Sequence, residues 1–437
     1  MTQSTHRMTR ASRRGRIAAG TAAATAGALI LAACGGGGEG DDGGDVSLTF
    51  TWWGDTSRTE RYEESIDLFE EQNPGITIQT QYGSWGDYWT ARNTEAAGGS
   101  LPDVMQMDIA YLTEYGAGNR LLDLEPHIGE QIDTSTLPES LMPSAQVGGT
   151  TYAIPTGTNT MATFFNTTLM AELDIEVPTE QLTWDEYHNL IAQLTEAGAA
   201  ADPQVYGAVD YTRVFWMFQM WLTQQGMSMF TDDGQLAFTE ADLAEWWSKT
   251  EDLRSTEGVV PAQQIAQLTE DPVSTGVAVS DVSWDNFLVR FSEGTGGDEF
   301  TMLPPPSDQP GEGGLFLKPS LLLAVGANSA HPEEAAQFID FIVNDPEVSE
   351  IFGTSRGVPA SDPAIEALSD AEGLDAAIID YEESVEPLLT AAPPPPVSGF
   401  GGLEEAFVRI YEELSYGQIT PAEAASQWFT EAQEAMS

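Results

Sequence analysis

Cysteine is nearly absent from this sequence. Cys34 is the only one among 437 residues, so no disulfide can form within the chain. The fold must therefore be held by packing, for which a composition of 41% hydrophobic residues supplies enough apolar surface. The length exceeds what one ordinary domain needs and favours two. We expect a globular chain with sizeable cores.

Positive charge is also scarce. The chain has 16 Lys and Arg against 69 Asp and Glu, a net charge of -53. Five of the arginines lie in the first 16 residues, which leaves 11 against 69, or -58, for the remainder. So anionic a surface repels nucleic acid and acidic lipid headgroups, and we expect neither as a partner. We interpret the acidity as an adaptation for solubility, while a cationic ligand stays open.

Signatures of catalysis and of metal binding are missing as well. The four histidines are far apart, and none forms an H-E-x-x-H or Cys/His pattern. Residues 353–357 match the G-x-S-x-G pattern, but no histidine follows them to serve as the base. We expect no catalytic residue, no metal and no cofactor. Carboxylates are too frequent for a glycosidase pair to be singled out or dismissed.

The first 45 residues predict export and attachment. Arginines at 7–16 precede an Ala-rich apolar stretch that ends in Leu31-Ala32-Ala33-Cys34. This ending resembles the bacterial lipobox, so we expect residues 1–33 to be a lipoprotein signal peptide and Cys34 to carry the lipid. A transmembrane anchor is the alternative, although the run is only weakly hydrophobic. Residues 34–45 are mainly Gly and Asp and predict a flexible tether.

The chain after the tether alternates between strand and helix patterns. Residues 46–53 alternate as a strand, residues 58–72 have helical spacing, and residues 76–82 alternate again. This order predicts a parallel βαβ unit, in which ligands bind beyond the carboxyl ends of the strands. Residues 101–108 predict a third strand that ends at Asp108. An α/β fold class follows.

Later segments add elements of both kinds. Residues 152–155 and 164–166 predict a strand pair and the crossing into a second lobe. Capping boxes predict that helices begin after Thr183 and Thr420. The other predicted elements are helices over 215–222 and from 331 and 345, strands over 276–284 and 321–325, a turn at 231–234 and an extended stretch over 393–396.

The motifs and their order along the chain resemble those of family 1 extracellular solute-binding proteins of carbohydrate ABC importers. This group includes the maltose- and multiple-sugar-binding lipoproteins. The segments that carry the resemblance are 69–76, 102–104, 152–155, 165–166, 183–186, 276–284, 331–338 and 356–359. The resemblance implies a two-lobed, periplasmic-binding-protein-like (type II) fold with a cleft between the lobes and hinge crossings. It assigns 46–155 plus 285–328 to lobe 1, and 156–284 plus 329–437 to lobe 2.

The same resemblance implies a function. The protein would capture a sugar or oligosaccharide outside the cytoplasmic membrane and deliver it to an ABC permease. We expect a monomer, without enzymatic activity, held at the outer face of that membrane by its N-terminal lipid. Two alternatives stay open: a surface lipoprotein glycosidase, or the same clamp fold binding another solute such as a peptide or polyamine.

A sugar offers apolar C–H faces and a rim of hydroxyls, so its site needs flat aromatic rings and a few polar groups. Trp53 and Asp55 lie at the carboxyl end of the first strand, Trp85 lies in the loop predicted after the second strand, and Asp108 could accept a hydroxyl or cap a helix. Trp284 ends a strand. The remaining candidates are Trp216, Arg356 and Phe400, for which core packing or helix capping is the competing interpretation.

Overall fold

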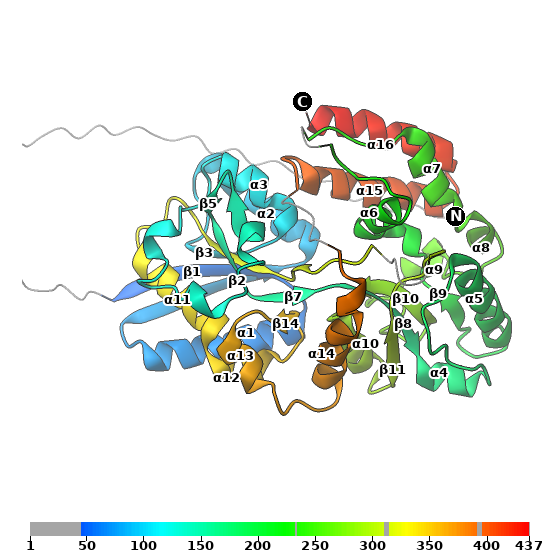
Figure 1. Cartoon of the computed structure of the whole chain (residues 1–437), viewed down its shortest axis with the longest axis horizontal. Coiled ribbons are helices and arrows are strands. Elements are labelled where there is room, and N and C mark those ends of the chain that lie inside the picture. Colours follow the sequence, from blue (N-terminus) through cyan, green and yellow to red (C-terminus); the bar gives the residue numbers. More distant parts are fainter. Residues whose placement is uncertain (1–44, 232–233, 310–313, 391–395, 437) are drawn as a thin grey trace, which may run out of the picture. The chain divides into compact units, whose positions relative to one another are not determined.

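The computed structural model describes residues 45–231, 234–309, 314–390 and 396–436 (Figure 1). The predicted signal peptide, Cys34, the tether up to residue 44, the centre of the turn at 231–234 and most of the extended stretch at 393–396 lie outside the described residues. Helices and strands alternate through the described parts, which confirms the predicted α/β class.

A five-stranded sheet holds the predicted βαβ unit. Its strands run in the order β2 (Ile76–Gly83), β1 (Val46–Trp53), β3 (Val104–Met107), β13 (Leu322–Val325) and β6 (Ala153–Pro155). The first three are parallel, and β13 is antiparallel to both of its neighbours. The carboxyl ends of β1, β2 and β3 therefore meet at one edge of this sheet.

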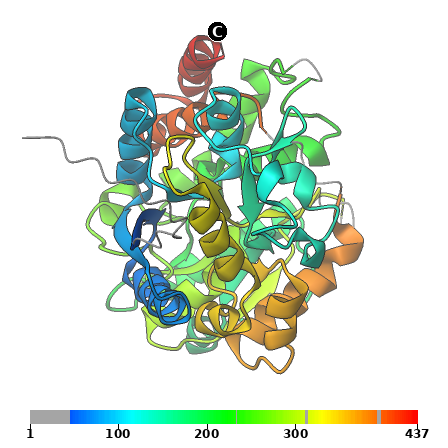
Figure 2. The same ribbon diagram turned by 90° about the vertical axis from the view of Figure 1, so that its left-hand side faces the viewer.

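The alternation along β1 separates two cores. Phe50 and Trp52 pack in the core that lies on the side of α1 (Thr56–Gln72), α11 (Pro332–Asn344) and α12 (Pro346–Phe352). Figure 2 views the molecule from the side on which the α1 ribbon, in blue, and the α11 ribbon, in yellow, lie. The Phe50 ring lies 5.0 Å from that of Tyr62 on α1 and 5.2 Å from that of Phe338 on α11. Trp53 faces the other side, toward α2 (Trp85–Gly98) and α3 (Ile109–Ala117).

A second sheet has four strands. Its order is β11 (Phe300–Leu303), β8 (Met161–Asn166), β10 (Ala278–Trp284) and β9 (Tyr206–Ala208). Helix α5 (Trp184–Gly198) contacts it through the Tyr187 hydroxyl, 2.9 Å from Ser280 Oγ. Helix α10 (Phe287–Thr295) contacts it where Phe291 packs edge-on against Phe164. The second sheet is thus built mostly from the middle of the chain.

A short three-stranded ribbon lies where the chain passes between the sheets. It consists of β12 (Lys318–Pro319), β7 (Gly157–Asn159) and β14 (Val358–Pro359). Strand β7 follows β6 of the first sheet and leads into β8 of the second, while β12 lies between β11 and β13. The approach is close, because a Cβ on Gly157 would lie 2.5 Å from the carbonyl oxygen of Val358.

These pairings correct two predictions. Residues 152–155 and 164–166 do not form a strand pair, because β6 joins the five-stranded sheet and β8 the four-stranded one. The lobe boundaries also differ from the packing. Strand β11 and helix α10, placed in lobe 1, pack with the second sheet, whereas α11, placed in lobe 2, packs on the first. Periodicity shows that a segment is a strand or helix, but not which sheet it joins.

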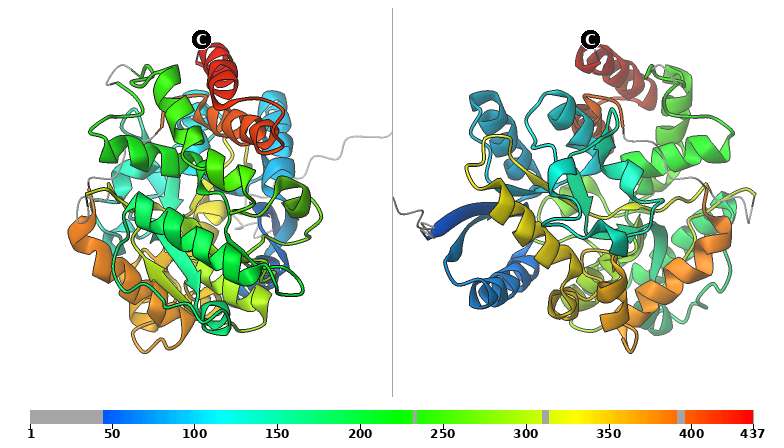
Figure 3. Two further views of the ribbon diagram at one scale, coloured as in Figure 1. Left: turned by 90° about the vertical axis from the view of Figure 1, so that its right-hand side faces the viewer. Right: turned by 60° about the vertical axis from the view of Figure 1, so that its left-hand side comes forward.

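Most of the remaining helices gather beside the second sheet (Figure 3), whereas α13 contacts α11 and α12. Phe215 of α6 packs at 4.9 Å from Phe407 of α15 and 5.9 Å from Trp428 of α16. Both predicted capping boxes, at Thr183 and Thr420, are present. The bounds not yet given are α4 (Thr167–Glu172), α6 (Phe215–Gln224), α7 (Glu240–Ser248), α8 (Glu251–Ser255), α9 (Ala262–Ile265), α13 (Asp362–Ala367), α14 (Leu374–Val385), α15 (Phe400–Ser415), α16 (Pro421–Ala435), β4 (Gln146–Val147) and β5 (Thr150–Thr151).

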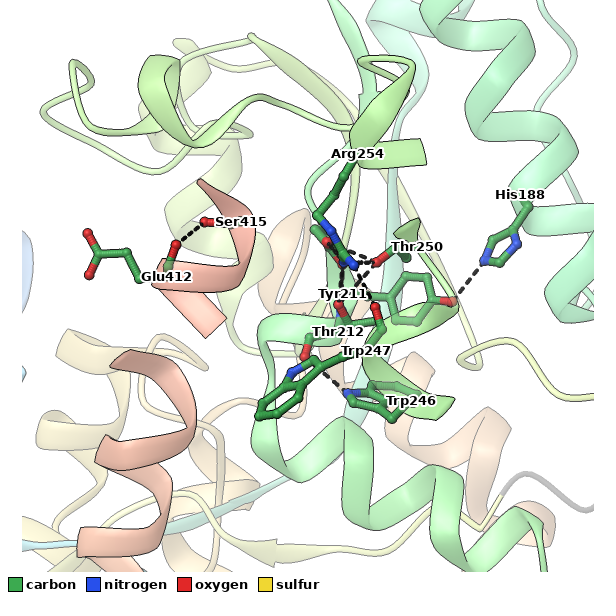
Figure 4. Close-up of polar contacts among 10 residues, drawn as sticks. His188, Tyr211, Thr212, Trp246, Trp247, Thr250, Arg254, Glu412 and Ser415 are labelled. Atoms are coloured by element: carbon green, nitrogen blue, oxygen red, sulfur yellow. Dashed lines mark hydrogen bonds and ion pairs between the residues drawn. The ribbon is translucent and has the colours of Figure 1, made fainter. Parts of the chain in front are cut away.

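A buried polar network joins α8 to the loop before α6 (Figure 4). Arg254 Nη1 donates to Asp210 Oδ2 over 2.8 Å, and the Thr250 and Thr212 hydroxyls donate to the same carboxylate. Burial alone would raise the pKa of Asp210, but the Arg254 charge and these hydrogen bonds outweigh it and lower the pKa. Trp246 donates from its indole to the Thr212 carbonyl, which links the network to α7.

Candidate ligand-binding site

A cavity of about 500 Å³ lies where residues of both sheets face one another. This volume is typical of small-molecule sites. Six of the eight predicted binding residues line it: Trp53, Asp55, Trp85, Asp108, Trp216 and Trp284. Helix α1 and strand β1 contribute from the first sheet, and β10 and α10 from the second. The cavity thus brings together residues as far apart in the chain as Trp53 and Glu404.

Two tryptophans form one wall. Trp53 at the end of β1 and Trp85 lie edge to face, with ring centroids 4.9 Å apart. Trp53 is only 8% exposed, because its other side packs against Tyr88, so it serves the core and the cavity together. Trp85 is the first residue of α2 and not part of a loop, which corrects that prediction. The helix begins there because Ser84 accepts a hydrogen bond from the Asp87 N–H.

A second pair of tryptophans comes from the other sheet. Trp284 ends β10 and is half-buried, and its ring lies 6.0 Å from that of Trp216 on α6. The ammonium nitrogen of Lys318 lies 4.7 Å from the Trp284 ring and 5.7 Å from the Trp216 ring. Both rings are therefore positioned against a cation on the ribbon strand β12.

The two predicted carboxylates cap helices. Asp55 accepts from the Arg58 N–H at 2.9 Å, and Asp108 Oδ1 accepts from the Ala110 N–H at 2.8 Å. The sequence left two roles open for Asp108, as a helix cap or as a hydrogen-bond acceptor for a ligand hydroxyl. One of its oxygens is the cap, and the other lies 3.9 Å from Lys318 Nζ in the cavity lining.

Arg356 and Phe400 lie outside the lining. Arg356 is buried, and its Nη2 donates to the Ile342 carbonyl in the last turn of α11. The sequence left capping of the preceding helix as its alternative, but the helix that directly precedes Arg356 is α12, so the capped helix is a different one. Phe400 is also buried and packs 5.1 Å from Trp216. The structure therefore places Phe400 behind a cavity tryptophan and Arg356 at a helix end.

Several lining residues were not predicted. Among them are four cationic and two amide side chains: Arg58, Arg61, Arg290, Lys318, Asn159 and Asn286. One signal could have pointed to the cations, because each of the 11 Lys and Arg after residue 33 is unusual in so acidic a chain. Nothing local in the sequence marks the asparagines, which reach the cavity through β7 and the start of α10.

Two buried oxygens in the lining lack a hydrogen-bond partner within the described ranges. They are Asn159 Oδ1 and Ser320 Oγ, on β7 and directly after β12. An unpaired buried acceptor is costly, and a ligand hydroxyl would satisfy it. The ribbon that links the sheets therefore also presents hydrogen-bonding groups to the cavity.

Glu404 of α15 completes the lining. Burial raises its pKa to about 8, and the neighbouring negative charge of Asp108 acts in the same direction. Lys318 and a hydrogen bond from Trp216 oppose this rise. Glu404 is therefore mostly a neutral acid at pH 7, able to donate a hydrogen bond.

The described residues contain no group of three or more His, Cys, Asp or Glu placed to hold a metal ion. None of the helices within the described ranges is long and apolar enough to cross a bilayer.

A cavity lined by tryptophans and polar groups beside two sheets suits the binding of a small solute. Residues 53–348 match the family model described as bacterial extracellular solute-binding protein. Because this match spans more than half of the chain, the protein belongs to that family.

Solved structures agree on the fold. A family 1 extracellular solute-binding protein from Alicyclobacillus acidocaldarius subsp. acidocaldarius DSM 446 is 26% identical, with a TM-score of 0.61, and the match covers 90% of this chain and 99% of that one. A periplasmic oligogalacturonide-binding protein from Yersinia enterocolitica, solved with saturated digalacturonic acid, is 22% identical with a TM-score of 0.76, covering 90% and 100%. A substrate-binding protein from Listeria monocytogenes, solved with cycloalternan, is 19% identical with a TM-score of 0.75, covering 89% and 99%. The predicted periplasmic-binding-protein-like fold is confirmed.

Curated relatives match over a shorter length. Proteins from Brucella abortus (strain 2308) and Brucella suis biovar 1 (strain 1330) are 23% identical over 195 residues, which is 44% of this chain and 46% of theirs. The chain thus spans about half the length of the curated relatives it matches.

Proposed function

We propose that this solute-binding protein captures a sugar or oligosaccharide and passes it to the permease of an ABC importer. The supporting observation is the cavity, in which four tryptophans from two sheets stand beside unpaired buried oxygens. Flat rings suit the C–H faces of a sugar, and polar atoms suit its hydroxyls. Two of the similar solved structures also contain an oligosaccharide ligand, digalacturonic acid in one and cycloalternan in the other.

Binding would involve movement of two lobes. We assign β1–β6, β13 and α11–α13 to one lobe, and β8–β11 with α5–α10 and α14–α16 to the other, which revises the boundaries expected from sequence. The three-stranded ribbon would be the hinge, because β7 passes directly from one sheet to the other. Closure would bring Trp53 and Trp284 together on the ligand and present a liganded shape to the permease.

The remaining parts of the proposal concern placement and chemistry. We infer that the protein acts as a monomer outside the cytoplasmic membrane, anchored by lipid on Cys34, and that it carries out no reaction of its own. The competing function is a glycosidase. It would need an acid and a carboxylate about 5–10 Å apart across the cavity, and Glu404 with a raised pKa is the acid it would use.

A ligand screen tests the proposal. Purified protein is heated with a panel of mono- and oligosaccharides, with polyamines and with short peptides as the comparison classes. A true ligand raises the melting temperature, and the rise grows with ligand concentration. At a free ligand concentration of 100 times Kd, the free energy of unfolding increases by about 2.7 kcal/mol. We expect sugars alone to do so. Stabilisation only by amines or peptides would reject a sugar ligand.

The same mixtures test for catalysis. After prolonged incubation with a stabilising oligosaccharide, chromatography should recover it intact. Release of shorter sugars would favour the glycosidase, and Glu404→Gln, which abolishes the acid while preserving shape, would then stop the release. Intact sugar together with calorimetric binding supports the transport role.

A further inference from the structure

The scarce cations of this chain gather in the cavity. Four of the 11 Lys and Arg that follow residue 33 line it: Arg58, Arg61, Arg290 and Lys318. Four acids line it as well, so the lining has one cation per acid, whereas the chain after residue 33 has 11 cations to 69 acids. A random sample of so acidic a surface would not show this balance. The cavity is an exception to the charge of the protein.

Arg58 is the least satisfied of the four. Its guanidinium donates from Nη1 to the Trp53 carbonyl at 3.2 Å, and it forms no ion pair within the described part of the chain. The nearby Asp55 carboxylate is used at the Arg58 backbone N–H instead. Most of the donors on this guanidinium therefore stay available.

Two further guanidinium groups act on Arg58. Burial lowers the pKa of Arg58, and the charges of Arg290 and Arg61 lower it further, against the opposite effects of Tyr62 and Asp55. Arg61 comes from α1, as Arg58 does, whereas Arg290 comes from α10 beside the other sheet. Like charges thus converge from both sides of the cavity, and this repulsion would be relieved by an anion between them.

The acids of the lining do not cancel these cations. Glu293 pairs with Arg61 at 3.1 Å, and Asp108 lies 3.9 Å from Lys318. Arg290 has its partner, Asp271, at 2.9 Å, outside the lining. Glu404 is mostly neutral at pH 7 because burial raises its pKa to about 8. Arg58 is the lining cation without an ion pair among the described residues, and the fourth lining acid, Asp55, accepts from the Arg58 backbone N–H instead of its guanidinium.

We propose that the solute is an acidic sugar, whose carboxylate is bound by Arg58 at the end of the cavity where Arg61 and Arg290 also lie. This inference rests on the proposed function and narrows it to sugars of the uronate type. An Arg guanidinium binds a carboxylate through two parallel hydrogen bonds, and it discriminates against a neutral hydroxymethyl group in the same place. The tryptophans contact the sugar rings, and the Arg58 guanidinium binds the carboxylate.

Matched sugars provide the test. Calorimetry at low salt compares oligogalacturonides with oligogalactosides of the same length, together with glucuronate-containing sugars and with sugar phosphates. We expect the carboxylate form to bind at least tenfold more tightly than its neutral counterpart, and to weaken as sodium chloride is raised. Sugar phosphates should bind more weakly than the carboxylates.

Variants connect the effect to Arg58. Arg58→Gln should weaken binding of the acidic sugar at least tenfold, and Arg58→Lys should recover only part of the loss, because lysine keeps the charge but not the planar fork. Arg120→Gln is the matched control, since it removes an equal charge from an exposed position outside the lining. Circular-dichroism melting checks that each variant is folded.

The possible results distinguish a failure of the acidic-sugar assignment from a failure of sugar binding itself. Equal binding of neutral and acidic sugars, unaffected by Arg58→Gln, would overturn the acidic ligand and leave sugar binding standing. Tighter binding of sugar phosphates would replace the carboxylate by a phosphate and so overturn the uronate assignment. If no sugar of any kind binds to folded protein, the proposed function falls as well.

Discussion

Arg61 Nη2 on α1 donates to Glu293 Oε1 on α10 over 3.1 Å, and this pair joins the helices of two different sheets beside the cavity. The two side chains are 22% and 48% exposed. Ion pairs so exposed typically contribute about 0–1 kcal/mol to stability. The pair therefore matters more for the charge of the cavity than for holding the fold together.

Glu293→Gln should strengthen the binding of an acidic sugar about two- to fivefold. The substitution removes the acid that competes for Arg61, so more positive charge faces the ligand. Titration calorimetry at low salt measures the change, and Glu350→Gln, at an exposed position on α12, controls for the lost charge. Weaker binding would instead mean that the ion pair helps to hold the bound arrangement of the two sheets.

Trp284→Ala should weaken sugar binding by more than tenfold. The half-buried ring would lose its contact with the sugar and its contact with Lys318, a combined effect that exceeds about 1.4 kcal/mol. Tyr82→Ala is the control, because Tyr82 is 59% exposed and lies outside the lining. Unchanged affinity by calorimetry would remove Trp284 from the site.

The raised pKa of Glu404 should make the stability of the folded protein depend on pH. Its pKa is about 8 in the folded protein and near 4.5 when unfolded, so between these values the folded state keeps a proton that the unfolded state has lost. Stability therefore falls as pH rises through this window. Glu404→Gln should show a smaller fall in melting temperature between pH 5 and 8, whereas Glu412→Gln, exposed on the same helix, should match the parent. Parallel curves for all three would contradict the raised pKa.

Binding of an acidic sugar should depend on the same group. Above about pH 8 Glu404 becomes charged and repels the ligand, so the affinity should decline from pH 6.5 to pH 9. In Glu404→Gln the decline should be absent. Calorimetry at both pH values measures it, and an identical decline in the variant would assign the effect to another residue.

Arg254→Met should cost about 3–5 kcal/mol of stability. It leaves Asp210 buried without its cation, and breaking such a pair is far more harmful than losing an exposed one. Arg409→Met removes a cation with half-exposed partners on α15 and α16 and should cost about 1 kcal/mol or less. Urea unfolding compares the two, and equal losses would show that the Asp210 network does not act as a buried ion pair.

Local patterns accounted for most elements and for much of the site. Strand β1 was predicted with its observed bounds, and Trp53 was preferred to Trp52 as a binding residue because it lies nearer the carboxyl end of the strand. Trp284 was predicted as the end of a strand, and capping boxes marked the starts of α5 and α16. These features depend on neighbours within a few positions, which sequence shows directly.

Long-range packing could not be read in this way. Arg58 and Arg290 lie 232 positions apart and meet because α1 and α10 flank one cavity, a relation that no spacing records. Arg356 was predicted as a binding residue because arginine is scarce after the N-terminal segment. The same argument applies equally to every other lysine and arginine there. Trp85 was misplaced in a loop because the capping serine before it was not recognised.

The ribbon of β12, β7 and β14 has a consequence for how the protein can be made. The first sheet takes its strands from two separate stretches of chain, and all of the second sheet is encoded between β6 and β13 of the first. The first sheet therefore cannot be obtained as one uninterrupted polypeptide without the second. The last strand of the first sheet, β13, is complete only when residue 325 has been synthesised. A chain truncated before that residue would leave the edges of neighbouring strands unpaired and prone to aggregation.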